Sequence, residues 1–192
     1  MNSTLFIFTV ISVFLTIFIE SLIFILQIKG RKFSRWFGKN AFRIHMTVVG
    51  FFWVLSFILI VLLQSGKHPH FHNIIILKWS GLILLVSGLA VAIWGFMVLG
   101  IKRSFGLNFF KDNVLVVKGS AYKFVKNPED YGLWAALAGF ALFSRSSFNL
   151  AIAIEFIILM VPHMMIENIP LKKPVFFEKQ DDQFLSKNAK MD

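Results

Sequence analysis

Five long apolar stretches, separated by polar segments, dominate the sequence. They cover residues 5–28, 44–63, 74–99, 128–144 and 148–166. A helix rises about 1.5 Å per residue, so about 20 apolar residues cross the hydrocarbon layer of a membrane. The first three stretches reach that length, 148–166 is just long enough, and the apolar core of the fourth, 131–143, is long enough only if its helix begins near Pro128. The pattern predicts five transmembrane helices, with the last two joined as a hairpin through 144–147.

The composition supports an all-α, polytopic membrane protein. Of the 192 residues, 57% are hydrophobic and 16% charged, with a mean hydropathy of +0.72; soluble domains have about 45–50% and about 25%. This excludes a soluble globular domain, a disordered chain and a fibrous protein. The chain has no cysteine and therefore no disulfide, thiolate metal ligand or thiol nucleophile. We expect one transmembrane domain over 1–171 and a polar cytosolic tail over 172–192.

The basic residues predict the orientation of this bundle. Seventeen of the twenty lie in the segments 29–43, 102–126 and 172–192, which a five-span chain places on one side of the membrane. Cytoplasmic loops carry an excess of Lys and Arg, so we expect the N-terminus outside and the C-terminus in the cytoplasm. A basic face also suits anionic headgroups. The net charge of +10 is therefore explained by the membrane, and we expect no nucleic-acid partner.

Charged side chains inside the predicted spans are candidate functional groups because they are costly in lipid. Glu20 lies in the first span, with Gln27 on the same helix face, and Glu155 lies in the last. An interhelical hydrogen bond, or a protonated carboxyl facing the bundle, is the favoured interpretation of both glutamates. The alternating histidines of 68–72 have no nearby carboxylate or cysteine, so we expect an interfacial loop and no metal site.

The polar boundary of the fourth span has the pattern of a helix start. Asn127 is expected to cap the first amides, Pro128 suits the first helical position, and Glu129 and Asp130 suit the positive end of the helix dipole. Small residues at helical spacing on the third and fourth spans predict close helix packing. They are Gly88, Ala92, Gly132, Ala135, Ala136 and Gly139.

The end of the last span carries two further polar residues. His163 and Glu167 are four residues apart, so they share a helix face at the predicted cytoplasmic boundary, directly after Pro162. They face a charged loop, which indicates either a pocket or a helix end with ordinary polar residues. The residues alone favour neither.

Several of these pieces occur in an order that resembles a known family. The pieces are Leu115-Val-Val-Lys-Gly119, Tyr122-Lys-Phe-Val-Lys-Asn-Pro128, Gly132, Gly139 and Glu167-Asn168-Ile-Pro-Leu171. Over 94–171 the chain resembles the core of the integral membrane methyltransferases, which include isoprenylcysteine carboxyl methyltransferase and the phospholipid N-methyltransferases. Asn127-Pro128 is closer to the phospholipid branch. Asn113 stands where many members have His, and Asn168 replaces a second Glu.

The resemblance implies S-adenosylmethionine as cofactor, held in a pocket formed by the helical hairpin. The implied cofactor-binding residues are Asn113, Leu115, Gly119, Tyr122, Lys126, Asn127, Pro128, His163 and Glu167. Lys126 and the helix start at Pro128 suit the carboxylate of the cofactor, and Glu167 suits its ribose hydroxyls or ammonium group. An amine acceptor has to lose a proton before it attacks. Glu129, Asp130 and Glu167 are the implied catalytic acceptors of that proton.

The expected function is methyl transfer from S-adenosylmethionine to a lipid-like acceptor that enters sideways between helices. A phospholipid amine is favoured over a prenylated or otherwise lipophilic carboxylate. One alternative is a non-catalytic membrane protein that retains the fold. Another is a relative of the membrane steroid reductases, which use a nicotinamide cofactor but have more spans and a longer chain.

Overall fold

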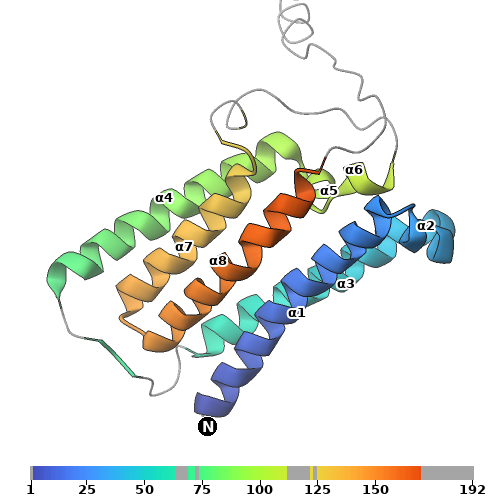
Figure 1. The fold of residues 1–192 in the computed structure, drawn as a ribbon. Coiled ribbons are helices and arrows are strands. Elements are labelled where there is room, and N and C mark those ends of the chain that lie inside the picture. The colour runs from blue at the N-terminus through green and yellow to red at the C-terminus, as the bar shows by residue number, and fades with distance from the viewer. Residues whose placement is uncertain (1, 64–68, 72–73, 112–121, 123–124, 170–192) are drawn as a thin grey trace, which may run out of the picture.

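The computed structural model describes residues 2–63, 69–71, 74–111, 122 and 125–169, and its long elements are all helices (Figure 1). In chain order they are α1 (Asn2–Ile28), α2 (Lys32–Phe37), the short 3-10 helix η1 (Gly38–Asn40), α3 (Ala41–Leu63), α4 (Ile75–Leu99), α5 (Ile101–Ser104), α6 (Leu107–Phe110), α7 (Pro128–Ser144) and α8 (Ser147–Glu167). In the described part of the chain, β-pairing is limited to one bridge between His70 and Ser146. The all-α prediction is confirmed.

Four segments are long and apolar enough to cross a membrane: Ser3–Ile28, Lys32–Leu63, Ile75–Leu99 and Ser147–Glu167. Their outward side chains fit a hydrocarbon environment, since Ile83 and Met97 on α4 are 69% and 79% exposed. The protein is therefore an integral membrane protein. The fourth predicted span, 128–144, is the 17-residue helix α7, which is shorter than these four segments.

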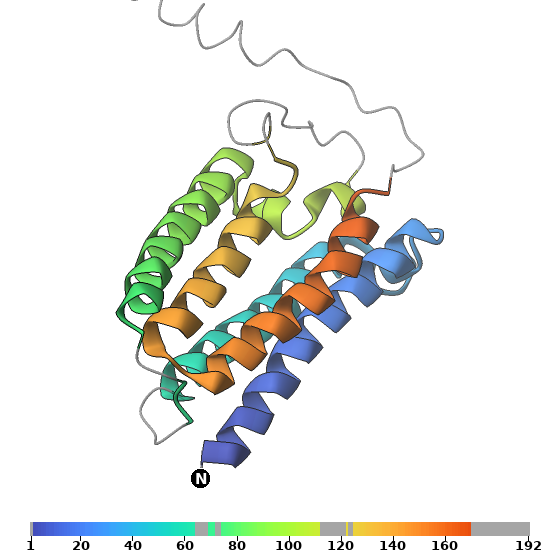
Figure 2. The ribbon, with the colours of Figure 1, turned by 60° about the vertical axis from the view of Figure 1, so that its left-hand side comes forward.

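Helices α4 and α7 lie side by side along their lengths, and the views in Figures 1 and 2 agree on this. Glycines allow the close approach. A Cβ on Gly88 would come within 2.5 Å of the Ala136 backbone nitrogen, and one on Gly139 within 2.3 Å of the Leu85 backbone nitrogen. Small residues let helix backbones approach closely in lipid. The predicted close packing is confirmed, and it fixes the position of the first turn of α7.

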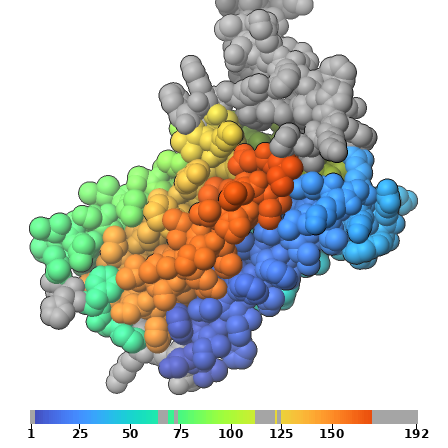
Figure 3. Space-filling view, in the orientation of Figure 1, coloured from blue at the N-terminus to red at the C-terminus, as the bar shows by residue number. Residues whose placement is uncertain are grey.

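Helix α8 joins the α4–α7 pair to the α1–α3 pair. Its buried residues Ile152, Phe156 and Met160 pack with Val13 and Ile17 of α1 in the main apolar core. On the face seen in Figure 3, α4, α7, α8 and α1 follow one another across the surface. Helices α7 and α8 form the predicted hairpin, in which the Ser146 hydroxyl accepts a hydrogen bond from the Asn149 backbone amide at 3.2 Å.

The short helices α5 and α6 lie across one end of the bundle, where α8 ends (Figure 1). Two contacts hold them there. His45 Nε2 of α3 lies 3.0 Å from the Phe105 carbonyl oxygen, and the Phe109 ring of α6 stacks on Phe24 of α1 with ring centres 4.2 Å apart. This end of the bundle is therefore covered by polypeptide, and the polar side chains beneath it are partly shielded from water.

Candidate active site

A cavity of about 250 Å³ lies beneath α5 and between α1, α3, α4, α7 and α8. The lining residues are Glu20, Trp53, Phe96, Ser104, Phe105, Glu129, Asp130, Leu133, Met160, His163 and Glu167. Four of them are carboxylic acids and one is histidine, whereas none of these described residues is Lys or Arg. Charged groups so close together in a membrane protein are costly and mark functional sites. The cavity is suited to a ligand that carries positive charge.

His163 is central among these groups and only 3% exposed. The Ser21 hydroxyl lies 2.8 Å from its Nδ1. Its Nε2 lies between two carboxyls, 4.0 Å from Glu20 Oε2 and 3.7 Å from Glu167 Oε1. The helical spacing of four residues does bring His163 and Glu167 together, as predicted. Because α1 supplies Ser21 and Glu20, both ring nitrogens of His163 face polar groups.

Asn127 connects the two ends of the hairpin instead of capping α7. Its backbone is left-handed, with φ 51° and ψ 55°, and its side chain makes no capping hydrogen bond. An Asn cap requires extended backbone angles, so the predicted cap is wrong. The Nδ2 amide donates instead to Glu167 Oε2 at 2.6 Å. Pro128 does occupy the start of the helix, and Glu129 and Asp130 do lie in its first turn.

Tyr122 and Gly95 both hold Glu129 in place. The Tyr122 hydroxyl donates to Glu129 Oε2 at 2.5 Å, and a Cβ on Gly95 of α4 would come within 2.8 Å of the Glu129 backbone nitrogen. Burial, followed by the hydrogen bond and charge of Glu129, raises the pKa of the Tyr122 phenol above its usual value. Tyr122 therefore stays protonated at physiological pH and remains a donor.

The structure brings some of the predicted site residues together and not others. Glu129, Asp130, His163 and Glu167 line the cavity, and Asn127 and Tyr122 reach it through their hydrogen bonds to Glu167 and Glu129. Lys126 is exposed and Pro128 is buried, and neither lines the cavity. Asn113, Leu115 and Gly119 lie outside the described residues.

Sequence reasoning missed the contribution of the N-terminal helices to this cavity. The sequence predicts an interhelical hydrogen bond or a protonated carboxyl facing the bundle for Glu20, and it gives Ser21 and Trp53 no role. The signal in the sequence is Glu20 itself, since a carboxyl within a membrane-spanning helix is costly and marks a functional site. Glu155 is also a carboxyl within a span, but it is half-buried and does not line the cavity. Its Oε2 has no hydrogen-bond partner in the described part of the chain.

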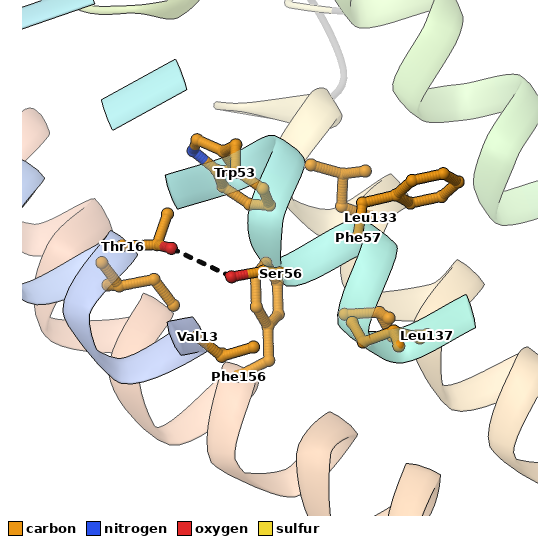
Figure 4. A pocket seen from close by; sticks show the side chains of 10 residues that line it. Val13, Thr16, Trp53, Ser56, Phe57, Leu133, Leu137 and Phe156 are labelled. Carbon is orange, nitrogen blue, oxygen red and sulfur yellow. Dashed lines mark hydrogen bonds between the residues drawn. The ribbon is translucent and has the colours of Figure 1, made fainter. Parts of the chain in front are cut away.

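A second, apolar pocket of about 140 Å³ adjoins the cavity. Its lining residues are Val13, Thr16, Ile17, Trp53, Ser56, Phe57, Ile60, Leu133, Leu137 and Phe156, and Figure 4 shows their side chains from close by. Trp53 and Leu133 line both spaces. Phe57 at the edge of the pocket is 68% exposed. The pocket thus extends from the polar cavity to the outer, lipid-facing surface of α3.

Comparison with known proteins gives one match. Residues 76–173, slightly more than half of the chain, match the family model described as phospholipid methyltransferase. The match covers α4 to α8, which include Glu129, Asp130, His163 and Glu167, and it leaves out α1 and α3. No curated protein and no solved structure matches the chain.

Proposed function

Because the chain belongs to the phospholipid methyltransferase family, we propose that the polar cavity beneath α5 is its active site. Members of this family are membrane enzymes that transfer a methyl group from S-adenosylmethionine to a phospholipid amine. The protein is therefore a methyltransferase that depends on S-adenosylmethionine. This membership decides against a steroid reductase and favours an amine acceptor over a lipophilic carboxylate.

The main support for this proposal is the concentration of acidic residues that line the cavity. Glu20, Glu129, Asp130 and Glu167 line the cavity together with His163, and none of the lining residues in the described part of the chain is Lys or Arg. Both reactants bring positive charge, because the acceptor is an ammonium group and S-adenosylmethionine, when bound, supplies an activated methyl on a positively charged sulfur. Carboxylates suit such groups. The residues present therefore fit the cofactor that the family uses.

The cofactor-binding side of the cavity is formed by the hairpin and the segment before it. Glu167, positioned by Asn127 and next to His163, is suited to accept hydrogen bonds from ribose hydroxyls or an ammonium group. Lys126 and the start of α7 at Pro128 are suited to the carboxylate of the cofactor. We extend the same role to Tyr122 and, from the resemblance, to Asn113, Leu115 and Gly119.

The acceptor amine loses a proton before it attacks, and the cavity offers nearby carboxyls for that proton. Glu129, Asp130 and Glu167 all line the space. One Glu129 oxygen already accepts from Tyr122 at 2.5 Å, which holds this carboxyl at the edge of the cavity. Asp130 and Glu167 lie on the same side of the cavity, at the ends of the hairpin helices. In this proposal the three carboxyls hold the cationic groups in line and are the final acceptors of the proton.

The apolar pocket in Figure 4 is suited to the acyl chains of the acceptor. It shares Trp53 and Leu133 with the polar cavity, so a headgroup in the cavity leaves its chains beside the pocket. Phe57 lies at the lipid-facing edge. A phospholipid would enter sideways from the bilayer through this edge, whereas the polar cofactor would enter from the cytosol. Restricted water access favours transfer to the amine over hydrolysis.

The proposed topology has five spans, with α7 as the fourth. Although α7 has only 17 residues, it follows α4 from Gly95, beside Glu129, to Gly81, beside Phe143. It would therefore cross the same depth of membrane as the inner part of α4. With five spans, the basic segments 29–43 and 102–126 lie on the same side, which we assign to the cytosol. The cavity then lies at the cytosolic boundary.

Two measurements on the purified protein test this function. Calorimetry with S-adenosylhomocysteine should show saturable binding, and phosphatidylethanolamine in mixed micelles should be methylated by S-adenosylmethionine. Glu167→Gln should weaken the binding. Lack of binding at millimolar cofactor would contradict the cavity assignment and favour a protein that kept the fold without catalysis.

A further inference from the structure

The family match begins at residue 76, yet part of the cavity comes from helices that precede it. The lining residues Glu20 and Trp53 lie on α1 and α3, and Ser21 of α1 contacts the lining residue His163. A cofactor common to a family is expected to be bound by the part of the chain that the family shares. The unmatched helices are then available for the acceptor. On the basis of the proposed function, we propose that Glu20 binds the ammonium group of the phospholipid acceptor and takes its proton.

The surroundings of Glu20 place it where a headgroup would meet its acyl chains. Its side chain lines the polar cavity and is buried. The Trp53 side chain forms a hydrogen bond with its carboxylate, and an indole N–H can only donate. Trp53 also lines the apolar pocket. Glu20 is thus held beside the boundary between the charged cavity and the space proposed for acyl chains.

Glu20 faces four other titratable groups across the cavity: Glu129 and Asp130 from α7, and His163 and Glu167 from α8. His163 Nε2 lies 4.0 Å from Glu20 Oε2 and 3.7 Å from Glu167 Oε1. These distances place one imidazole nitrogen between the two carboxyls. The Glu167 side chain is 19% exposed, compared with 7% for Glu20. Glu20, His163 and Glu167 thus form a row of three groups, which runs from the buried interior toward the end of α8.

The proton step follows from this row. An N–H bond of the acceptor ammonium breaks, its electron pair stays on nitrogen, and the proton moves to a Glu20 oxygen. The amine is then neutral and has a free electron pair. His163 is oriented by Ser21 through Nδ1, and its Nε2 lies 4.0 Å from Glu20 and 3.7 Å from Glu167. When the acceptor is bound, these contacts have to shorten to hydrogen bonds; Nε2 then takes the proton from Glu20 and passes it to Glu167, which is closer to bulk water. Glu20 returns to the carboxylate and is ready for the next acceptor.

Glu20→Gln is the primary test because it keeps the size of the side chain and removes the base. Binding of S-adenosylhomocysteine should stay within about twofold, whereas binding of short-chain phosphatidylethanolamine to the cofactor-free protein should weaken about tenfold or more. Phosphatidylcholine with the same chains has no N–H, so its binding should change less. The kcat with phosphatidylethanolamine should fall about 100-fold or more, and the loss should decrease at high pH, where the amine is already neutral.

Two further variants make the test decisive. Glu155→Gln removes a carboxyl from the last span outside the cavity and should leave binding and the pH profile as in wild type. Trp53→Phe keeps an aromatic ring but removes the donor to Glu20, and it should weaken phosphatidylethanolamine binding without changing S-adenosylhomocysteine binding. This second variant decides the question if Glu20→Gln does not fold.

The outcomes also separate this proposal from the proposed function. If Glu20→Gln methylates phosphatidylethanolamine like wild type with the same pH profile, Glu20 is not the base. If it loses S-adenosylhomocysteine binding to the same extent as Glu167→Gln, Glu20 serves the cofactor and the acceptor assignment is wrong. If wild type binds no S-adenosylhomocysteine, the proposed function itself fails.

Discussion

The side-chain amide of Asn127 donates a 2.6 Å hydrogen bond to Glu167 Oε2 and thereby joins the start of α7 to the end of α8. The two residues are forty positions apart in the sequence. Their helices are connected at the opposite end through Arg145 and Ser146. The bond therefore closes the open end of the hairpin and holds the Glu167 carboxyl at the cavity. Because the Asn127 side chain is engaged by Glu167, it does not cap the first amides of α7.

Glu167→Gln should weaken binding of S-adenosylhomocysteine by about ten- to a hundredfold, because a charge-assisted hydrogen bond contributes roughly 1.5–3 kcal/mol. The substitution keeps the shape of the side chain, so the fold should be preserved. Calorimetry measures the affinity, and Glu155→Gln on the same helix is the matched control. Equal affinity in wild type and Glu167→Gln would show that this carboxyl does not contact the cofactor.

Tyr122→Phe should lower stability in a pH-dependent way. The raised pKa of Tyr122 means that the folded state retains a proton which the unfolded chain releases above about pH 10. The stabilisation is therefore complete below that pH and is lost as pH rises further. Thermal melting in detergent should show a constant difference between wild type and variant from pH 6 to 9, and a smaller one above about 10. A difference that grows above that pH would contradict this account.

Gly95→Ala should affect both stability and the site. A Cβ at this position would come within 2.8 Å of the Glu129 backbone nitrogen and 3.1 Å of its Oε2, so α7 has to shift. Overpacking of this kind costs about 1–3 kcal/mol. Gly88→Ala is the control, because its Cβ meets the Ala136 backbone nitrogen at 2.5 Å, away from the cavity. Both variants should melt earlier, but only Gly95→Ala should also lose methyltransferase activity at temperatures where both are folded.

The five long helices were predictable from the sequence because apolar length determines them in a membrane, whereas the short helices α2, α5 and α6 were not predicted. The predicted range 148–166 and the observed Ser147–Glu167 differ by one residue at each end. The partners within the site were not predictable in this way. Ser21 and His163 are 142 residues apart, and no local spacing rule connects them. The Asn127 cap was wrong because local rules assume extended backbone, whereas the contact with Glu167 favours a left-handed conformation.

The orientation of the bundle can be tested with single cysteines, since the chain has none of its own. Lys39→Cys lies in the exposed segment between α1 and α3, and His70→Cys lies near the α7–α8 turn at the opposite end. If the basic segments are cytosolic, an impermeant maleimide should label His70→Cys from outside and Lys39→Cys only after permeabilisation. The reverse pattern would invert the topology, and labelling of both from one side would exclude five spans.

Leu137→Trp should separate acyl-chain binding from headgroup chemistry. Leu137 lines the apolar pocket but not the polar cavity, so a larger side chain there would fill the pocket of about 140 Å³ without touching Glu167 or His163. We expect a higher KM for long-chain phosphatidylethanolamine, little change for a short-chain analogue, and unchanged S-adenosylhomocysteine binding. Ile158→Trp is the control, because Ile158 on α8 is 63% exposed and an added ring there faces lipid. The expected pattern is a rise in KM that becomes larger with acyl-chain length in Leu137→Trp and is absent in Ile158→Trp. An equal rise in KM for long-chain and short-chain substrates would mean that the acyl chains lie elsewhere on the bundle.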